Sequence, residues 1–169
     1  IIQIPCLNEA EHLPATLETL PRSVPGFDVV EWLVIDDGST DDTQQVAKAC
    51  GVDHVIGFPR NRGLAAAFSY GIEESLRRGA DVVVNTDADN QYDSSCIPAL
   101  VAPIVAGEAD IVVGDRKTGK VAEFSVVKRA LQTAGTTVVR SISGLSVGDA
   151  TSGFRAYSRA AAMSLVITT

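Results

Sequence analysis

The feature that most restricts the fold is the alternation of apolar, β-branched runs with segments of helical periodicity. Continuous apolar strands that alternate with helices are typical of a mostly parallel sheet whose two faces are both covered by helices. No internal repeat, low-complexity tract or linker interrupts this pattern. The sequence therefore predicts one doubly wound α/β domain over residues 1–169, with strands at 1–5, 31–36, 52–58, 81–87, 109–114 and 151–157.

Several of the helical segments have recognisable ends. Ser39 and Asp42 form a predicted capping box for a helix that stops before Gly51. A second helix begins near Leu64 and is expected to end at Gly79, because glycine commonly follows the last turn of a helix. The remaining expectations are a helix that begins near Ser94 or Ser95 with Pro98 in its first turn, a charged loop over 115–125 and a helix over 126–143.

The charge distribution restricts the partners of the chain. Its net charge is −7, which argues against a nucleic-acid partner, because clustered Lys and Arg side chains bind phosphate backbones. Residues 1–114 contain 6 basic and 18 acidic side chains, whereas residues 115–169 contain 8 basic and 3 acidic ones. The last third of the chain either faces an anionic partner or is an ordinary solvated basic surface.

No segment of the sequence is expected to cross a membrane. No apolar run approaches the roughly 18 residues that a membrane-spanning helix requires. The chain begins without Met, directly on a predicted strand, and stops just after a helical stretch. We therefore expect a piece that is trimmed at both ends, with any anchor lying beyond it.

The cysteines give no sign of a disulfide framework or a zinc site. Cys6, Cys50 and Cys96 are odd in number, widely spaced and not grouped with His12 or His54. They are interpreted as small buried hydrophobic residues of a protein in the reducing cytoplasm.

Polar side chains follow four of the predicted strands, at the point where each strand ends. Ligands of open parallel sheets bind outside the carboxyl ends of the strands, so these residues are expected to converge on one edge. The four segments are Pro5-Cys6-Leu7-Asn8-Glu9, Asp36-Asp37-Gly38-Ser39, Asp87-Ala88-Asp89-Asn90-Gln91 and Gly114-Asp115-Arg116.

Asp87 and Asp89 are the candidate metal ligands. A turn after a strand can aim both carboxylates into one crevice, where they repel each other unless a cation lies between them. Oxygen ligands without a nearby His or Cys favour Mg²⁺ or Mn²⁺ over zinc, and such a cation would bridge the diphosphate of a nucleotide. The alternative is that this Asp-x-Asp is only a turn and a cap.

The Asp36-Asp37-Gly38-Ser39 segment has two interpretations. A carboxylate in this turn could accept a hydrogen bond from a base N–H or a ribose hydroxyl. Asp, Gly and Ser are also the residues that a turn from strand to helix needs for structural reasons.

Taken together and in order, the motifs resemble the family 2 glycosyltransferases of GT-A fold, and within them the dolichyl- or polyprenyl-phosphate sugar synthases. The resemblance covers nearly the whole chain. Besides the four polar segments, it rests on Asn61-Arg62-Gly63-Leu64 and on Asp149-Ala150-Thr151-Ser152-Gly153-Phe154-Arg155. It implies a three-layer, Rossmann-like fold and inverting transfer of a sugar from a nucleoside-diphosphate donor, a UDP- or GDP-sugar.

The resemblance also implies a role for each matching residue. Pro5, Asn8 and Glu9 would line the nucleoside pocket, and Asp37 would meet the base. The metal and the donor diphosphate would be held by Asp87, Asp89 and Gln91, with Asp89 acting in catalysis by holding the cation at the leaving group. Residues expected near the donor or acceptor phosphates are Arg116, Arg129 and Arg155, the last of them as a catalytic group.

The resemblance implies a polyprenyl or dolichyl phosphate acceptor at the cytoplasmic face of a membrane. A phosphate oxygen is already ionised near neutral pH and needs no strong base, whereas a saccharide hydroxyl needs one, for which Asp149 is the candidate. Asp149 could instead cap the turn before a strand. Asp115 departs from the Gly-Ser-Arg that is usual in this branch, and this carboxylate leaves a saccharide acceptor open.

Two alternatives come from other functional classes. A phosphatase of the haloacid-dehalogenase type also places Asp-x-Asp after a buried strand, but it has Thr or Val where this chain has Gln91. A non-catalytic module that binds nucleotide sugars would keep the pocket and lose turnover. The Gln-x-x-Arg-Trp signature of processive polysaccharide synthases is absent from the sequence, which argues against chain elongation.

Overall fold

The computed structural model describes residues 1–114 and 152–167. Asp115, Arg116, Arg129 and Asp149 lie outside these ranges, as do the predicted loop over 115–125 and the predicted helix over 126–143. In chain order the described elements are β1 (Ile2–Cys6), α1 (Leu13–Thr19), β2 (Trp32–Asp36), α2 (Thr43–Ala49), β3 (His54–Gly57), α3 (Leu64–Arg77), β4 (Val82–Asn85), the short 3₁₀ helix η1 (Ser94–Cys96), α4 (Ile97–Val105), β5 (Ile111–Val113), β6 (Arg155–Ser158) and α6 (Arg159–Ile167).

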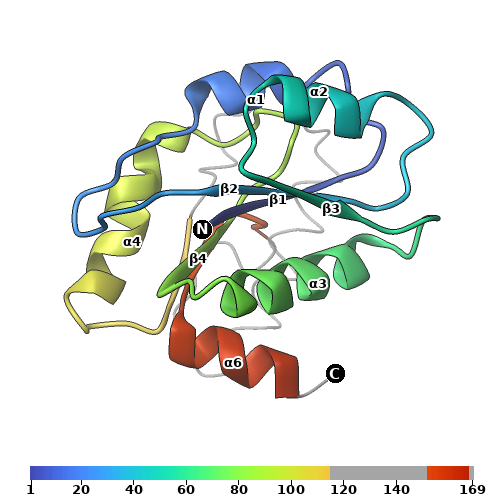
Figure 1. Cartoon of the computed structure of the whole chain (residues 1–169). Helices are drawn as coiled ribbons and strands as arrows, with labels where there is room; N and C mark the ends of the chain where they lie inside the picture. The colour runs from blue at the N-terminus through green and yellow to red at the C-terminus, as the bar shows by residue number, and fades with distance from the viewer. Residues whose placement is uncertain (115–151, 168–169) are drawn as a thin grey trace, which may run out of the picture.

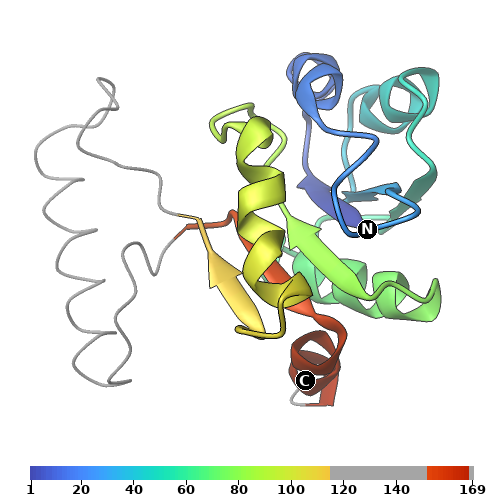
Figure 2. The same cartoon turned by 90° about the vertical axis from the view of Figure 1, so that its left-hand side faces the viewer.

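A sheet with the strand order β3-β2-β1-β4-β6-β5 forms the centre of the described structure. β1 pairs in parallel with β2 and β4, and β2 pairs in parallel with β3. β6 lies between β4 and β5 and is antiparallel to both, as Figure 2 shows. The prediction of a mostly parallel sheet is therefore confirmed. Because the strand order reverses at β1, a crevice is expected between the carboxyl ends of β1 and β4.

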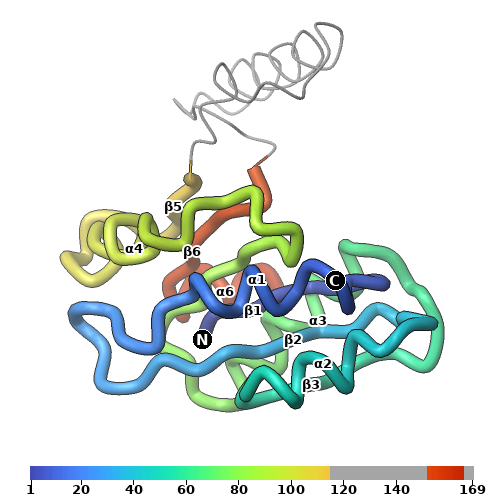
Figure 3. Tube along the Cα trace, turned by 90° about the horizontal axis from the view of Figure 1, so that it is seen from above, coloured from blue at the N-terminus to red at the C-terminus, as the bar shows by residue number. Residues whose placement is uncertain are grey.

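The sheet is the middle layer of three. Strand side chains alternate between its faces, so that Ile4 and Val34 pack on one side whereas Leu33 and Val83 pack on the other. The first side is covered by α1, α2 and α4, and the second by α3 and α6 (Figure 1). Seen from above, α1 and α2 lie near each other (Figure 3). Both faces of the strands are therefore buried, which is the reason for their continuous apolar runs.

The predicted capping box is wrong. α2 begins at Thr43, and its N-cap residue Asp42 makes no side-chain hydrogen bond to the helix. The carboxylate of Asp41 instead accepts hydrogen bonds from the backbone N–H and the hydroxyl of Thr43. The hydroxyl of Ser39 is occupied elsewhere, because it accepts a hydrogen bond from the backbone N–H of Asn8.

The other helix boundaries lie close to their predicted positions. α3 begins at Leu64 and is followed by Gly79 in a left-handed conformation, with φ of +83°. The Asp93 carboxylate accepts a hydrogen bond from the backbone N–H of Ser95 and caps η1, after which α4 begins with Pro98 in its first turn. None of the helices in the described ranges has both the length and the apolar character to span a bilayer.

Candidate active site

A cavity of about 280 Å³ opens at the crevice between the carboxyl ends of β1 and β4. Three segments that the sequence analysis selected contribute to it, those that follow β1, β2 and β4. Four carboxylates and no basic side chain belong to its described lining. The lining residues are Pro5, Cys6, Leu7, Glu9, Asp37, Asn61, Leu64, Ala67, Asp87, Ala88 and Asp89.

The structure brings Asp87 and Asp89 to this one cavity, as predicted from the strand ends. Asp87 is half-buried and Asp89 is exposed, and an Asp89 carboxylate oxygen accepts a hydrogen bond of 3.1 Å from the backbone N–H of Gln91. The Gln91 side chain is exposed, and the residue is not part of the cavity lining. Its role as a metal ligand stays a prediction.

The donor set suits a metal that is shared with a substrate. In the parts of the chain that the structure describes, no group of three or more His, Cys, Asp and Glu side chains could hold a metal ion. Mg²⁺ and similar cations are commonly held by only one or two carboxylates, with substrate phosphates as further ligands. Asp87 and Asp89 fit that pattern.

Asp37 has a structural role in addition to its place in the cavity. It is 3% exposed, and its two carboxylate oxygens accept hydrogen bonds from the backbone N–H groups of Arg62 (2.7 Å) and Gly63 (2.8 Å). The carboxylate thereby clamps the loop that precedes α3 against the end of β2. A carboxylate has about four acceptor positions, so Asp37 can still accept a hydrogen bond from a ligand.

Gly38, which follows Asp37, is required by the same loop. Its φ is +76°, and a Cβ at this position would lie 2.3 Å from the backbone carbon of Arg60. No side chain fits between this turn and the loop at Arg60. The Asp-Asp-Gly-Ser turn is therefore needed for the fold, and its Asp37 also lines the cavity. The adjacent Asp36 is also buried, and its carboxylate accepts a hydrogen bond from the backbone N–H of Ser39.

Among the three residues predicted to line the nucleoside pocket, Pro5 and Glu9 belong to the cavity and Asn8 does not. The Asn8 side-chain oxygen accepts hydrogen bonds from the backbone N–H of Thr40 (2.8 Å) and from its hydroxyl (3.2 Å). Asn8 therefore ties the loop after β1 to the loop after β2. Its contact with a nucleoside stays a prediction.

Cys6 lines the cavity without being suited to act as a nucleophile. The residue is 3% exposed, and burial raises the pKa of its thiol far above the usual range. Neighbouring carboxylates, Glu9 among them, raise the pKa further. A neutral thiol is a poor nucleophile, so Cys6 is a packing residue of the pocket wall. The prediction that the cysteines are buried is confirmed for Cys6 and is wrong for Cys96, which is exposed, while Cys50 is partly buried.

Arg155 is placed at the same edge of the sheet but outside the cavity lining. It is the first residue of β6 and pairs with Asn85, the last residue of β4. Its Nε donates a hydrogen bond of 2.7 Å to the carbonyl oxygen of Ser152. Arg116, Arg129 and Asp149 lie outside the described residues, so no contact is assigned to them.

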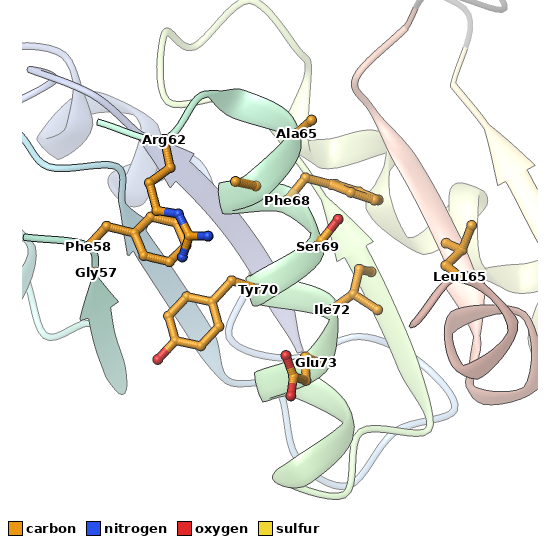
Figure 4. Close-up of a pocket in the computed structure, with 11 residues that line it drawn as sticks. Gly57, Phe58, Arg62, Ala65, Phe68, Ser69, Tyr70, Ile72, Glu73 and Leu165 are labelled. Carbon is orange, nitrogen blue, oxygen red and sulfur yellow. The ribbon is translucent and has the colours of Figure 1, made fainter. Parts of the chain in front are cut away.

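A larger cavity, of about 660 Å³, lies on the outer side of α3 and reaches Leu165 of α6 (Figure 4). Its walls are mostly apolar, with Phe58 and Tyr70 stacked at 5.1 Å and the Arg62 guanidinium 4.7 Å from the centre of the Phe58 ring. Glu73 is the one carboxylate of its described lining. The paired carboxylates make the smaller cavity the candidate active site.

Comparison with known proteins identifies the family. The family described as Glycosyl transferase family 2 matches residues 1–166. The chain belongs to glycosyltransferase family 2. Membership of this family argues against the phosphatase alternative, and the three-layer architecture is that of the GT-A glycosyltransferases.

Two relatives of this family 2 glycosyltransferase are named for polyprenyl-type substrates. The chain is 36% identical over 160 residues to an undecaprenyl-phosphate mannosyltransferase from Micrococcus luteus, covering 91% of the chain and 64% of that protein. It is 32% identical over 166 residues to a polyprenol monophosphomannose synthase from Mycolicibacterium smegmatis, covering 94% of the chain and 61% of that protein. The chain thus spans less than two thirds of the length of these relatives.

One similar solved structure contains a metal ion and a nucleotide sugar. Glucosyl-3-phosphoglycerate synthase from Mycobacterium tuberculosis, in complex with Mn²⁺ and UDP-glucose, superposes with a TM-score of 0.68 at 28% identity. The similarity covers 94% of this chain and 55% of that one.

Thr16 supports the candidate active site, and the sequence analysis did not identify it. Its hydroxyl donates a hydrogen bond of 2.6 Å to the carbonyl oxygen of Ala88, between the two candidate metal ligands. Thr16 is 3% exposed, and the neighbouring Leu13 and Leu17 are buried in the core. The packing of α1 therefore fixes the turn that carries Asp87 and Asp89. A lone Thr in an amphipathic helix gives no sequence signal for this contact.

We expect Thr16→Val to loosen this turn. The shape is kept while the buried Ala88 carbonyl loses its partner, so the free energy of unfolding should fall by about 1–3 kcal/mol in urea denaturation. The Mn²⁺-dependent transfer rate should fall about tenfold or more. Thr19→Val is the matched control, since the exposed Thr19 hydroxyl only bonds the carbonyl of Thr16 in its own helix. An unchanged rate in Thr16→Val would contradict a role in holding the turn.

Proposed function

We propose that this chain is the catalytic domain, over residues 1–169, of an inverting, metal-dependent glycosyltransferase. It transfers a sugar from a UDP- or GDP-sugar to a polyprenyl phosphate. The observation that carries the proposal is the single cavity in which Asp87 and Asp89 meet Asp37 and Glu9. The names of the two mannosyl relatives support the acceptor, and the Mn²⁺ and UDP-glucose in a similar structure support the donor and the cation.

In this proposal the nucleoside lies against Pro5, Glu9 and Asp37. Asn8 supports that wall from behind through its hydrogen bonds to Thr40. Asp37 accepts a hydrogen bond from the base with a lone pair that the loop before α3 does not use. The burial of Asp37 removes part of the competition by water and strengthens such a bond.

The diphosphate lies on the opposite side, where Asp87 and Asp89 hold Mg²⁺ or Mn²⁺ with Gln91 nearby. When bound, the cation neutralises the negative charge that develops on the departing nucleoside diphosphate. Arg155, Arg116 and Arg129 supply further positive charge to the donor and acceptor phosphates through charge-assisted hydrogen bonds. These interactions strengthen as the leaving group gains charge, so they lower the barrier rather than only favouring binding.

The acceptor oxygen of a polyprenyl phosphate attacks the anomeric carbon from the face opposite the leaving group. This oxygen is already ionised near neutral pH, so the reaction requires no strong base. The excess of basic residues in 115–169 suits an anionic head group at the cytoplasmic face of a membrane.

A second candidate is transfer to the hydroxyl of a small soluble acceptor. It is favoured by the similar solved structures, which include complexes of glucosyl-3-phosphoglycerate synthase with phosphoglyceric acid. A hydroxyl acceptor requires a general base, and Asp149 is the residue proposed for that role.

We expect the purified chain, supplied with Mn²⁺ and a radiolabelled UDP- or GDP-sugar, to transfer label to polyprenyl phosphate. Mannose and glucose donors of both nucleosides are compared, and the product is recovered by organic extraction. Label only on phosphoglyceric acid or on a free saccharide, with Asp149→Asn inactive, would replace the lipid acceptor by a hydroxyl one. Donor binding without any transfer, with binding read from the increase in melting temperature, would indicate a non-catalytic module.

A further inference from the structure

Gly153 lies directly against the Asp87 carboxylate. A Cβ built on Gly153 would lie 2.9 Å from Oδ1 of Asp87 and 3.0 Å from Oδ2. The φ of Gly153 is not in the left-handed region, so alanine could adopt this backbone conformation. Glycine is therefore needed here for space rather than for its freedom of conformation. The space that a side chain would fill is occupied by the carboxylate of a candidate metal ligand.

The Gly153 peptide is held from both sides by buried side chains. Its N–H donates a hydrogen bond of 2.9 Å to the Tyr92 hydroxyl, and its carbonyl oxygen accepts one of 2.8 Å from Nδ2 of Asn85. Tyr92 is 8% exposed, and its ring stacks on Phe154 with centroids 5.1 Å apart. The backbone that borders Asp87 is therefore anchored both to the end of β4 and to the loop before η1.

Gln3 of β1 fixes the orientation of Asn85. Nε2 of Gln3 donates a hydrogen bond of 2.9 Å to Oδ1 of Asn85, which leaves the Asn85 amide nitrogen for the carbonyl of Gly153. Reversing the Asn85 amide would place its oxygen against that carbonyl, acceptor facing acceptor. Within the described residues Oε1 of the fully buried Gln3 has no partner. Gln3 thus leaves its Oε1 without a hydrogen bond from the described residues, while its Nε2 keeps the hydrogen bond to Asn85.

We propose that Gly153 is a positioning residue for Asp87. Its bare backbone, fixed by Asn85 and Tyr92, is the surface against which the Asp87 carboxylate packs, and it sets where that carboxylate stands in the cavity. Because Arg155 follows two residues later, the same peptide links the position of the metal ligand to the strand that carries the arginine. This inference rests on the proposed function, since it assigns a purpose to the position of Asp87.

A positioning role for Gly153 predicts that a side chain at this position displaces the Asp87 carboxylate, whereas a purely structural role predicts only a loss of stability. Asp87 is half-buried and borders a cavity, so it can turn away from a new methyl group without disturbing the core. Gly153→Ala should therefore move the carboxylate and leave the fold in place. Removal of the support of a metal ligand typically weakens metal affinity or activity by 10- to 100-fold.

The test measures binding of Mn²⁺ to the chain by calorimetry, in the presence of saturating UDP or GDP, with melting temperature recorded in parallel. Gly153→Ala should weaken Mn²⁺ binding about tenfold or more while melting close to the unchanged chain. Tyr92→Phe keeps the ring on Phe154 but removes the acceptor of the Gly153 N–H, and a weaker loss in the same direction is expected. Tyr70→Phe is the control, because its ring stacks on Phe58 outside the active site.

Unchanged Mn²⁺ affinity in Gly153→Ala would overturn the inference, even with a lower melting temperature. If Gly153→Ala does not fold, the Mn²⁺ affinity of Tyr92→Phe decides. A Tyr92→Phe affinity equal to that of the Tyr70→Phe control would then overturn the inference. Failure of the proposed function is distinguishable, since the unchanged chain would then bind no Mn²⁺ with the nucleotide and transfer no sugar.

Discussion

Asp89→Ala should abolish Mn²⁺-dependent donor binding and lower sugar transfer by at least about a hundredfold, with little change in stability. Asp89 is exposed and lines the cavity, so its removal takes a proposed metal ligand from the site and nothing from the core. Transfer is measured with and without a chelator, and the free energy of unfolding by urea denaturation.

Asp93→Ala is the matched control for this prediction. Asp93 is an exposed carboxylate in the same loop, but it caps η1 and is outside the cavity lining. It should lose about 1 kcal/mol of stability, as expected for a lost N-cap, and keep its transfer rate. Asp89→Ala is thus expected to lose transfer and keep its stability, whereas Asp93→Ala is expected to lose stability and keep its transfer rate. Full transfer in the presence of the chelator would refute the metal assignment.

The second large effect is expected at Asp37, where one carboxylate serves both the fold and the pocket. In Asp37→Asn one of the two hydrogen bonds from Arg62 and Gly63 is lost, because the new NH₂ group faces a backbone N–H. The free energy of unfolding should fall by about 1–3 kcal/mol, and the affinity for free UDP or GDP should fall with it.

Urea denaturation and calorimetry with the free nucleotide separate these two effects. Asp28→Asn is the control, since Asp28 is an exposed carboxylate in the segment between α1 and β2. A loss of stability in Asp37→Asn with unchanged nucleotide affinity would make Asp37 a structural residue only.

The layered fold was predictable because burial on both faces of a parallel sheet leaves continuous apolar runs in the sequence. The place of β6 between β4 and β5 was not, since strand order depends on pairing between distant segments. The capping box at Ser39 failed for a local reason, because α2 begins at Thr43, which hydrogen-bonds to Asp41, while the Ser39 hydroxyl accepts a hydrogen bond from Asn8. Sequence spacing alone does not say which of several competing side chains makes such a bond.

The candidate site was predictable to the extent that it follows from the ends of the strands. Asp87 and Asp89 were expected at the edge where the strands end, and the structure places both in a cavity there. The sequence could not decide whether Asp37 clamps a loop, binds a base or does both, because the two roles need the same residue type. The contacts of Thr16 and Gly153 join segments far apart in the chain, and only the folded backbone reveals them.

The acidic character of the cavity bears on the order in which ligands enter. Glu9, Asp37, Asp87 and Asp89 surround a space whose described lining has no positive side chain, so a bare nucleoside diphosphate is repelled there. A donor that arrives as a chelate with a divalent cation carries less negative charge and offers the carboxylates a partner. The same repulsion acts after the reaction, when loss of the cation leaves the nucleotide among like charges. Under the proposed function, entry and exit of the nucleotide would thereby be coupled to the cation, independently of any contribution that the cation makes to bond cleavage.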